Sequence, residues 1–320
     1  MSSRLNWGIL GTGNIAHAFA KGLKTSETGV LAAVGSRTLD SARAFADEFG
    51  VETAHASYEA LLADPGVDAI YISTPHPFHA YWAIQCARAG KHILCEKPIT
   101  LNHADTMAVV EAARAAGVFL MEAFMYRCHP QTLKMVELIR EGAIGEVRMM
   151  QIAFGFRAGA DPESRLMKNS LGGGGILDVG GYPVSLARLV AGTAQGRDFA
   201  DPVEVKAMGH IGPETRIDEY TAALLRFEGD IIAQVATGVR LQQDNGARIF
   251  GTEGSIHIPS PWLVARDGGK WSFTLQRSGQ DDAETVSGQE PRGLYGVEAD
   301  TFARSLEAGH TLAPAMSPED

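Results

Sequence analysis

The regular alternation of short apolar runs with amphipathic stretches limits how the first 121 residues can fold. Five apolar runs, at 5–10, 30–36, 68–74, 91–95 and 118–121, have the composition of β-strands. Their apolar character is almost continuous, as expected for strands that are covered on both faces. Amphipathic stretches between them predict helices, right-handed crossovers and a doubly wound parallel sheet.

The second half of the chain has a different pattern. Polar and apolar residues alternate there, and Gly-containing turns occur at 228–230 and 252–254. This pattern predicts antiparallel strands at 146–156, 202–212, 218–229, 230–239 and 247–258. One long helix is expected at about 175–191. We therefore predict two domains, 1–122 and 123–320, the second an α+β domain with a large open, mostly antiparallel sheet.

Composition excludes several classes of protein. Hydrophobic residues make up 45% and charged residues 21% of the 320 residues, which is ordinary for a soluble globular protein. The net charge of −10 argues against nucleic acid as a partner. Cys86, Cys95 and Cys128 have no metal-ligand spacing, so no metal site is predicted and reduced thiols are expected. With no signal peptide and no apolar stretch of membrane-spanning length, a cytoplasmic location and no membrane partner are expected.

The last four residues, Ser317-Pro318-Glu319-Asp320, have the pattern of a helix start. Serine is a common N-cap, proline is favoured at the first helical position, and acidic residues suit the first turn. We therefore expect the chain to continue past residue 320.

A glycine motif follows the first predicted strand. Gly11-Thr12-Gly13-Asn14-Ile15-Ala16 is a G-x-G-x-x-A sequence that opens an amphipathic helix. The glycines permit a tight turn and close approach of a pyrophosphate, and the helix N-terminus supplies N–H groups. A plain strand-to-helix turn is the alternative, but the position in the first βαβ unit favours a dinucleotide-binding Rossmann domain at 1–122.

The end of the second strand bears on which dinucleotide binds. An NAD site usually has an acidic residue here, whereas this chain has Ser36-Arg37. Both side chains can bind a 2′-phosphate, so NADP(H) is favoured over NAD(H). Asp40 is expected in the first turn of the next helix. The alternative is that Arg37 is an ordinary solvated surface residue.

Ligands of open parallel sheets bind beyond the carboxyl ends of the strands. Three such ends carry polar residues, in the segments 73–79, 96–98 and 121–129. Lys97 precedes Pro98, which favours an extended backbone from which the lysine can project into the crevice. An exposed Glu96–Lys97 pair of little energetic value is the alternative.

The segment 171–192, LGGGGILDVGGYPVSLARLVAG, is the other unusual stretch. Asp178 and Tyr182 are four residues apart, so they share one face of the expected helix. Gly180 and Gly181 cost stability in a helix, about 1 kcal/mol each relative to alanine, which indicates close approach of a backbone or ligand. A polar cap at Asp178 and a packing role for Tyr182 are the alternative.

Taken together, the motif at 11–16, Glu96-Lys97-Pro98 and the pattern G-G-G-x-x-x-D-x-G-x-Y ending at Tyr182 resemble the glucose–fructose oxidoreductase, inositol dehydrogenase and MocA (Gfo/Idh/MocA) family. The segments LMEAFMYR and SRL most resemble its branch of dimeric dihydrodiol dehydrogenases and NADP-dependent D-xylose dehydrogenases. The resemblance implies hydride transfer between NADP(H) and a hydroxyl-bearing carbon of a sugar, cyclic polyol or trans-diol.

The resemblance also implies roles for individual residues. Tyr182 is the first candidate for proton transfer and Lys97 the second, with Asp178 orienting Lys97 or binding a substrate hydroxyl. Arg127 and Arg165 are candidates for the substrate pocket. Residues implied in cofactor binding are Gly11, Thr12, Gly13, Asn14, Ile15, Ser36, Arg37, Thr74, Pro75, His76, His79, Glu96 and Lys97.

Two alternative functions remain open from the sequence. Some relatives are catalytically silent cofactor sensors or co-regulators, although retention of Lys97, Asp178 and Tyr182 favours an enzyme. Others retain their cofactor and shuttle hydride between two sugars. By analogy with the family, a homodimer or higher homo-oligomer is expected through the C-terminal sheet.

Overall fold

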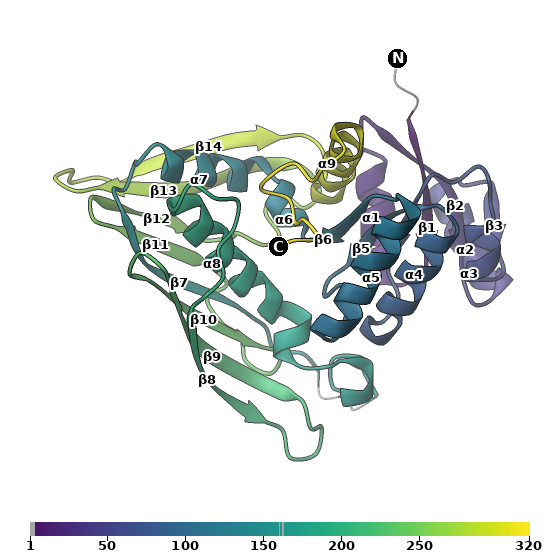
Figure 1. Ribbon diagram of the computed structural model, residues 1–320, viewed down its shortest axis with the longest axis horizontal. Coiled ribbons are helices and arrows are strands. Elements are labelled where there is room, and N and C mark those ends of the chain that lie inside the picture. Colours follow the sequence, from purple (N-terminus) through teal and green to yellow (C-terminus); the bar gives the residue numbers. More distant parts are fainter. Residues whose placement is uncertain (1–3, 160, 162) are drawn as a thin grey trace. The chain divides into compact units, whose positions relative to one another are not determined.

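The computed structural model describes residues 4–159, 161 and 163–320, which divide into two compact units (Figure 1). The first unit comprises Met1–Cys128, Ala265–Gly269 and Pro291–Asp320. The second comprises His129–Val264 and Lys270–Glu290. Each unit contains its own sheet, and each is described below by itself.

The first unit is built on a six-stranded sheet in which all neighbouring strands are parallel, in the order β3-β2-β1-β4-β5-β6. Its strands are β1 (Leu5–Leu10), β2 (Gly29–Gly35), β3 (Thr53–His55), β4 (Ala69–Ile72), β5 (His92–Glu96) and β6 (Leu120–Ala123). Its helices are α1 (Asn14–Leu23), α2 (Leu39–Phe49), α3 (Tyr58–Leu62), η1 (His76–Phe78), α4 (His79–Arg88), α5 (His103–Ala116), α6 (Met125–Cys128) and α9 (Leu294–Ala308). This order confirms the predicted doubly wound sheet.

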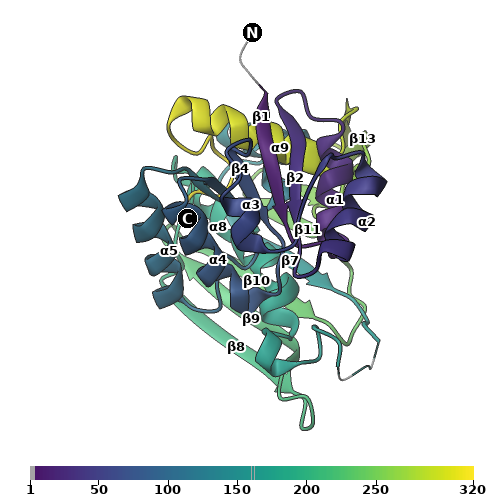
Figure 2. The same cartoon turned by 90° about the vertical axis from the view of Figure 1, so that its right-hand side faces the viewer.

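Helices cover both faces of this sheet, which explains why its strands are apolar throughout. Figure 2 shows α4 and α5 on the side of the sheet away from α1 and α2. On the α1 side, Phe19 stacks on Tyr71 with ring centroids 3.8 Å apart, and Trp7 contacts Phe302 of α9 at 4.9 Å. Because these large side chains fill one layer, α9 becomes part of the core of the first unit.

The second unit contains an eight-stranded sheet in the order β14-β13-β12-β11-β7-β10-β9-β8. Its strands are β7 (Val147–Gly155), β8 (Glu204–Ile211), β9 (Asp218–Phe227), β10 (Ile231–Gly238), β11 (Ala247–Gly251), β12 (Gly254–Ile258), β13 (Gly269–Arg277) and β14 (Glu284–Glu290). Its helical segments are α7 (Pro130–Arg140), η2 (Asn169–Leu171), the π-helix η3 (Ile176–Gly180) and α8 (Gly181–Ala194). The central β7 and β10 pair in parallel, and the other pairings with a known register are antiparallel.

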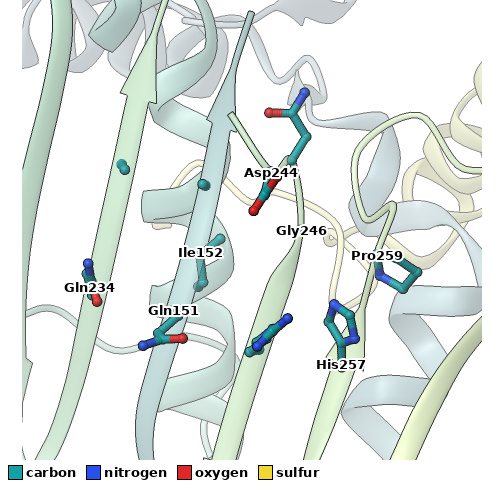
Figure 3. Close-up of a pocket in the computed structure, with 11 residues that line it drawn as sticks. Gln151, Ile152, Gln234, Asp244, Gly246, His257 and Pro259 are labelled. Atoms are coloured by element: carbon teal, nitrogen blue, oxygen red, sulfur yellow. The ribbon is translucent and has the colours of Figure 1, made fainter. Parts of the chain in front are cut away.

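Helices α7 and α8 lie on one face of this sheet (Figure 1), and the other face is exposed. Side chains alternate between the two faces, so that Met150 and Ile152 are buried whereas Gln151 is exposed. A hollow of about 650 Å³ lies on the exposed face (Figure 3). Gln234, Gln151, Arg248 and His257 form one row across four neighbouring strands along this hollow.

The observed units differ from the predicted division at 122 in two ways. The first unit continues through α6 to Cys128, and the chain returns to it at 265–269 and 291–320. The physical reason is that α9 packs against α1 and α6, burying Phe302 completely. The sequence analysis predicted no element at 294–308, and periodicity alone carries no signal of which sheet a helix packs against.

Two further details of the secondary structure differ from the expected elements. The run 247–258 forms two strands, β11 and β12, joined by the turn predicted at 252–254. The expected helix at 175–191 begins with the π-helix η3 before α8. Within the described part of the chain, none of the helices has the length and apolarity needed to cross a membrane.

Candidate active site

The glycine turn after β1 leaves the start of α1 open. Gly11 has φ +108°, and a Cβ there would lie 3.0 Å from Ser73 Oγ, so only glycine fits without strain. A Cβ on Gly13 would meet none of the described atoms within 4 Å. Gly13 is also the N-cap of α1 and supplies no side chain to cap it. The first-turn N–H groups, including those of Asn14 and Ile15, can therefore bind a phosphate.

The end of β2 lies beside this turn. Thr12 Oγ1 is 3.4 Å from Ser36 Oγ. Ser36 is buried, whereas Arg37 is exposed. Asp40 lies in the first turn of α2, as predicted, and Thr38 caps that helix by accepting a hydrogen bond from Ser41 N–H. The strand end thus presents a hydroxyl and a guanidinium.

A hollow of about 720 Å³ brings six of the thirteen predicted cofactor residues together. Its lining includes the predicted residues Thr12, Gly13, Ser36, Arg37, Thr74 and Pro75. Thr74 Oγ1 is buried and has no hydrogen-bond partner among the described residues. An unsatisfied buried hydroxyl is costly, so this one is suited to a bound polar group.

The same hollow has an aromatic wall that the sequence analysis missed. Tyr58 and Trp82 meet edge to face with ring centroids 4.9 Å apart, and Tyr81 contacts Trp82 at the same separation. Burial raises the pKa of Tyr58, and the positive charge of Arg37 partly opposes that rise. No local sequence pattern distinguishes these aromatic residues from core residues, because α3 and α4 bring them together from 24 residues apart in the chain.

The polar end of β5 is held in place by a neighbouring strand. Tyr71 of β4 donates a hydrogen bond to Glu96 Oε1 at 2.5 Å, and the Lys97 N–H donates to Glu96 Oε2 at 3.2 Å. Glu96 is only 7% exposed, so the alternative of a solvated Glu–Lys pair is wrong. The Lys97-Pro98 peptide bond is cis.

Glu122, at the end of β6, is a second anchor for this segment, and the sequence analysis gave it no role. Its Oε1 accepts a hydrogen bond from Ile99 N–H at 2.7 Å. Burial raises the pKa of Glu122 from 4.5 to about 7. His76 and His79 follow β4, and both are buried. The structure therefore places Lys97 between strand ends that are fixed by buried polar groups.

In the second unit, two glycines of the run at 172–175 leave room for Asp218, another residue that the sequence analysis missed. Asp218 Oδ2, at the start of β9, accepts a hydrogen bond from Ile176 N–H at 2.7 Å. A Cβ on Gly174 would lie 2.3 Å from Asp218 Oδ1, and one on Gly175 would lie 3.0 Å from Gly238 Cα. Burial raises the pKa of Asp218, although backbone hydrogen bonds oppose this. The glycines let the carboxylate reach the start of the π-helix.

That π-helix carries Asp178, and α8 carries Tyr182. Arg165 donates a hydrogen bond to Asp178 Oδ1 at 2.8 Å, so two predicted site residues are brought together. Tyr182 is 3% exposed and packs edge to face against Phe154 and Trp262, at centroid distances of 5.2 and 5.6 Å. Short π-helical turns beside α-helices are frequent at functional sites. Lys97 belongs to the first unit, whereas the π-helix and α8 belong to the second.

Arg127 lies in a different environment from the one expected of a substrate-binding residue. Its side chain is 1% exposed, and it donates hydrogen bonds to Pro314 O at 2.6 Å and to Asp320 Oδ2 at 2.5 Å. Both partners belong to the C-terminal segment of the same unit. Arg127 therefore holds that segment, and we do not include it in the proposed substrate-binding set.

Comparison with known proteins identifies the class. The family model described as "Oxidoreductase family, NAD-binding Rossmann fold" matches residues 5–124, and the "GFO/IDH/MocA C-terminal domain" model matches residues 132–257. The fold and the hollow beside the glycine turn are those of a nucleotide-dependent oxidoreductase. The chain belongs to the Gfo/Idh/MocA family.

Curated relatives align over most of both chains. D-xylose 1-dehydrogenase (NADP(+)) 2 from Haloferax volcanii is 35% identical over 306 residues, covering 95% of this chain and 90% of the relative. Trans-1,2-dihydrobenzene-1,2-diol dehydrogenase from Xenopus tropicalis is 35% identical over 320 residues, covering 98% and 93%. This confirms the predicted branch of the family.

Solved structures of other oxidoreductases superpose on almost the whole chain. A 3-ketoreductase from Actinomadura kijaniata, in complex with NADP and TDP-benzene, superposes with a TM-score of 0.83 at 26% identity, covering 97% of this chain and 92% of that one. An aldose-aldose oxidoreductase from Caulobacter crescentus gives 0.86 at 25% identity, covering 99% and 93%. The protein is an NAD(P)-dependent oxidoreductase acting on CH–OH groups.

Proposed function

We propose that the protein is an NADP(H)-dependent dehydrogenase or reductase for a hydroxyl-bearing carbon of a sugar, cyclic polyol or trans-diol. The observation that carries this proposal is the hollow that joins the glycine turn to Ser36, Arg37 and Thr74. The names of the aligned dehydrogenases support the substrate class.

The preference for NADP(H) rests on the charge at the end of β2. A 2′-phosphate placed there would meet the hydroxyl of Ser36 and the guanidinium of Arg37. Glu59 also lines the hollow, but it lies in the first turn of α3 and not at the strand end that usually binds the ribose.

Replacement of Arg37 tests this preference. We expect NADP(H) to bind about tenfold or more tightly than NAD(H), and Arg37→Ala to remove most of that difference by loss of a charge-assisted hydrogen bond. Fluorescence titration with each nucleotide measures both affinities. Arg43→Ala, on the exposed face of α2, is the matched control and should leave the ratio unchanged. Equal affinities in the wild type would refute the preference.

The reaction needs one group that moves the hydroxyl proton. When bound, the nicotinamide supplies or accepts the hydride. We propose that the Tyr182 hydroxyl gives or takes the substrate proton, that Lys97 is the second candidate for this step, and that Asp178 orients Lys97 or binds a substrate hydroxyl. Arg165 extends the substrate-binding set through its ion pair with Asp178.

The remaining predicted residues are assigned to the cofactor. We propose that the backbone N–H groups of the first turn of α1 bind the pyrophosphate, and that residues after β4 and at or after the end of β5 surround the nicotinamide. The residues in this second group are Thr74, Pro75, His76, His79, Glu96 and Lys97. A panel of aldoses, inositols and cyclic diols, assayed with both nucleotides at the absorbance of the reduced cofactor, tests the substrate class. Turnover of none of them would refute it.

A homo-oligomer formed through the exposed face of the eight-stranded sheet is part of this proposal. Met208, Leu224, Ile232 and Met149 lie on that face and are 85%, 50%, 43% and 38% exposed. Apolar side chains gathered at such exposure mark an interaction surface. Leu224→Glu should convert the assembly to monomers in analytical ultracentrifugation. A monomeric wild-type protein would contradict the proposal.

Retention of the cofactor for transfer between two sugars is a second candidate, favoured by the similarity to the aldose-aldose oxidoreductase. Protein purified by gel filtration without added nucleotide would then contain nearly one NADP(H) per chain by mass spectrometry. Nucleotide-free protein would exclude this candidate and leave the first in place.

A further inference from the structure

The histidines of this protein differ in what faces their ring nitrogens. His92 Nδ1 accepts a hydrogen bond from Phe119 N–H at 3.0 Å, and His129 Nδ1 accepts one from Gln131 N–H at 3.1 Å. An accepting nitrogen carries no proton, so both rings are neutral. Burial acts in the same direction, since it lowers the pKa of His92 and lowers that of His129 to about 4.

His79 has the opposite surroundings. Its Nδ1 lies 2.8 Å from Pro98 O, and its Nε2 lies 2.7 Å from Thr74 O. A backbone carbonyl oxygen can only accept a hydrogen bond, so each ring nitrogen must carry a proton. A neutral imidazole has one N–H and would leave one nitrogen lone pair facing a carbonyl oxygen. Only the imidazolium cation satisfies both contacts. The residue is fully buried, at 0% exposed, and burial opposes the charge, so the two hydrogen bonds must offset that cost.

The neighbouring elements do not offer a simpler explanation for these contacts. His79 is the first residue of α4, where the helix dipole disfavours a cation, so the two carbonyl oxygens must compensate. The buried face of α5, which packs against α4, carries only Val109, Val110 and Ala113. The titratable groups on the segments that His79 joins are His76, with its ring centroid 5.7 Å away, and Glu96 and Lys97.

The two carbonyl groups belong to the segments that follow β4 and β5. Thr74 comes two residues after β4, and Pro98 comes two residues after β5 and directly after Lys97. One charged ring therefore links both chain segments that we assign to the nicotinamide end of the site. Charge-assisted hydrogen bonds are roughly twice as strong as neutral ones, so this link is stiffer than one made by a neutral side chain.

We propose that His79 is a permanently charged imidazolium near neutral pH and acts as a positioning residue, holding the segment that carries Lys97 at a fixed distance from Thr74. It does not exchange a proton with the substrate. The effect on catalysis rests on the proposed function, whereas the charge state of His79 does not.

Nitrogen-15 NMR of the histidine side chains in the wild-type protein tests the charge state. At about pH 8, above the ordinary histidine pKa, both nitrogens of His79 should carry a directly bonded proton, whereas His92 should have one unprotonated nitrogen. His79→Asn identifies the resonance, and His79→Gln takes its place if the first variant does not fold. One unprotonated nitrogen on His79 at that pH would overturn the proposal. This measurement needs no substrate, so it stands apart from any failure of the proposed function.

Kinetics test the positioning role. In His79→Asn, kcat should fall on the order of 10- to 100-fold, because a small displacement of a catalytic group is costly. Affinity for the nucleotide should fall by a smaller factor than kcat, since the contacts at the adenosine end are retained. His92→Asn, at the other end of β5, is the matched control and should retain wild-type kcat. An unchanged kcat in His79→Asn, or an equal loss in the control, would overturn the role.

Discussion

A partly buried carboxylate anchors the functional segment in each unit, and the two anchors differ in what they demand of the sequence around them. In the first unit, Glu122 accepts the Ile99 N–H two residues after Lys97. In the second, Asp218 accepts the Ile176 N–H two residues before Asp178. Both hydrogen bonds are 2.7 Å long. Each carboxylate belongs to a strand, β6 or β9, that is distant in the sequence from the segment it holds.

The difference lies in the space around each carboxylate. Gly174, with φ +109°, and Gly175 leave room for Asp218, whereas the Ile99 segment accommodates Glu122 without any glycine. A carboxylate at the end of a parallel strand already faces the neighbouring strand end, because all these ends meet at one edge of the sheet. The start of a π-helix does not lie at the edge of a sheet. Glycines are therefore needed there, because a side chain would block the carboxylate from the backbone. The second anchor should therefore be far less tolerant of substitution.

The largest expected effect comes from removing a reactive side chain in either unit. Lys97→Met and Tyr182→Phe should each lower kcat by about 10²-fold or more, because a general acid or base contributes at least this factor. Nucleotide affinity, measured by fluorescence titration, should remain within a few-fold of wild type. Lys206→Met and Tyr220→Phe, on the exposed strands β8 and β9, serve as controls. Wild-type kcat in either test variant would remove that residue from the mechanism.

A pair of glycine substitutions tests the contrast in tolerance. Gly174→Ala should destabilise the protein by about 2–4 kcal/mol, because it combines a clash with a left-handed backbone. Gly13→Ala, with φ −82°, has open space and should change the unfolding free energy by less than about 0.5 kcal/mol. It should instead weaken nucleotide binding, since the pyrophosphate approaches the backbone there. Urea denaturation and nucleotide titration separate the two effects; equal destabilisation would contradict the contrast.

The pH dependence of stability tests the anchors themselves. Burial raises the pKa of Glu122 from 4.5 to about 7, so the folded protein binds this proton more tightly than the unfolded chain does. The free energy of unfolding should therefore fall as pH rises from about 4.5 to 7, by on the order of 2–3 kcal/mol.

Glu122→Gln should remove that slope while keeping an acceptor for Ile99 N–H. Asp218→Asn should act with the same sign at lower pH, because burial raises the pKa of Asp218 from 3.8. Urea denaturation of each variant across this pH range, compared with wild type, gives the measurement. A slope that persists in Glu122→Gln would assign it to another group.

A small effect on stability is expected at Arg165, the partner of Asp178, and a larger one at Tyr71, the partner of Glu96. Arg165 is 39% exposed, so Arg165→Ala should cost less than about 1 kcal/mol of stability and act mainly on KM. Tyr71→Phe removes a buried hydrogen bond to Glu96 and should cost about 1–3 kcal/mol. Thermal unfolding and steady-state kinetics distinguish these two variants. A larger loss for Arg165→Ala would mean that its ion pair supports the fold.

Much of the first unit was predictable because its signals are local. Strand, glycine turn and helix follow one another at 5–23, and the strand ends that carry Ser36, Thr74 and Lys97 are read directly from the alternation. Glu122, Asp218 and Tyr58 were not predictable as site residues, since their partners lie 23, 42 and 24 residues away. Arg127 was expected near the substrate, but its guanidinium binds residues near 320 instead.

By itself, the sequence determined the parallel sheet, the glycine turn and the residue types available for chemistry, because periodicity, glycine conformations and strand ends are properties of short segments. Tertiary structure alone decided that Glu96 is buried and hydrogen-bonded by Tyr71, that Asp218 requires glycine at 174 and 175, and that His79 faces two carbonyl oxygens. Each of these depends on the backbone of one segment lying within about 3 Å of a side chain from another, and local sequence carries no record of such distances.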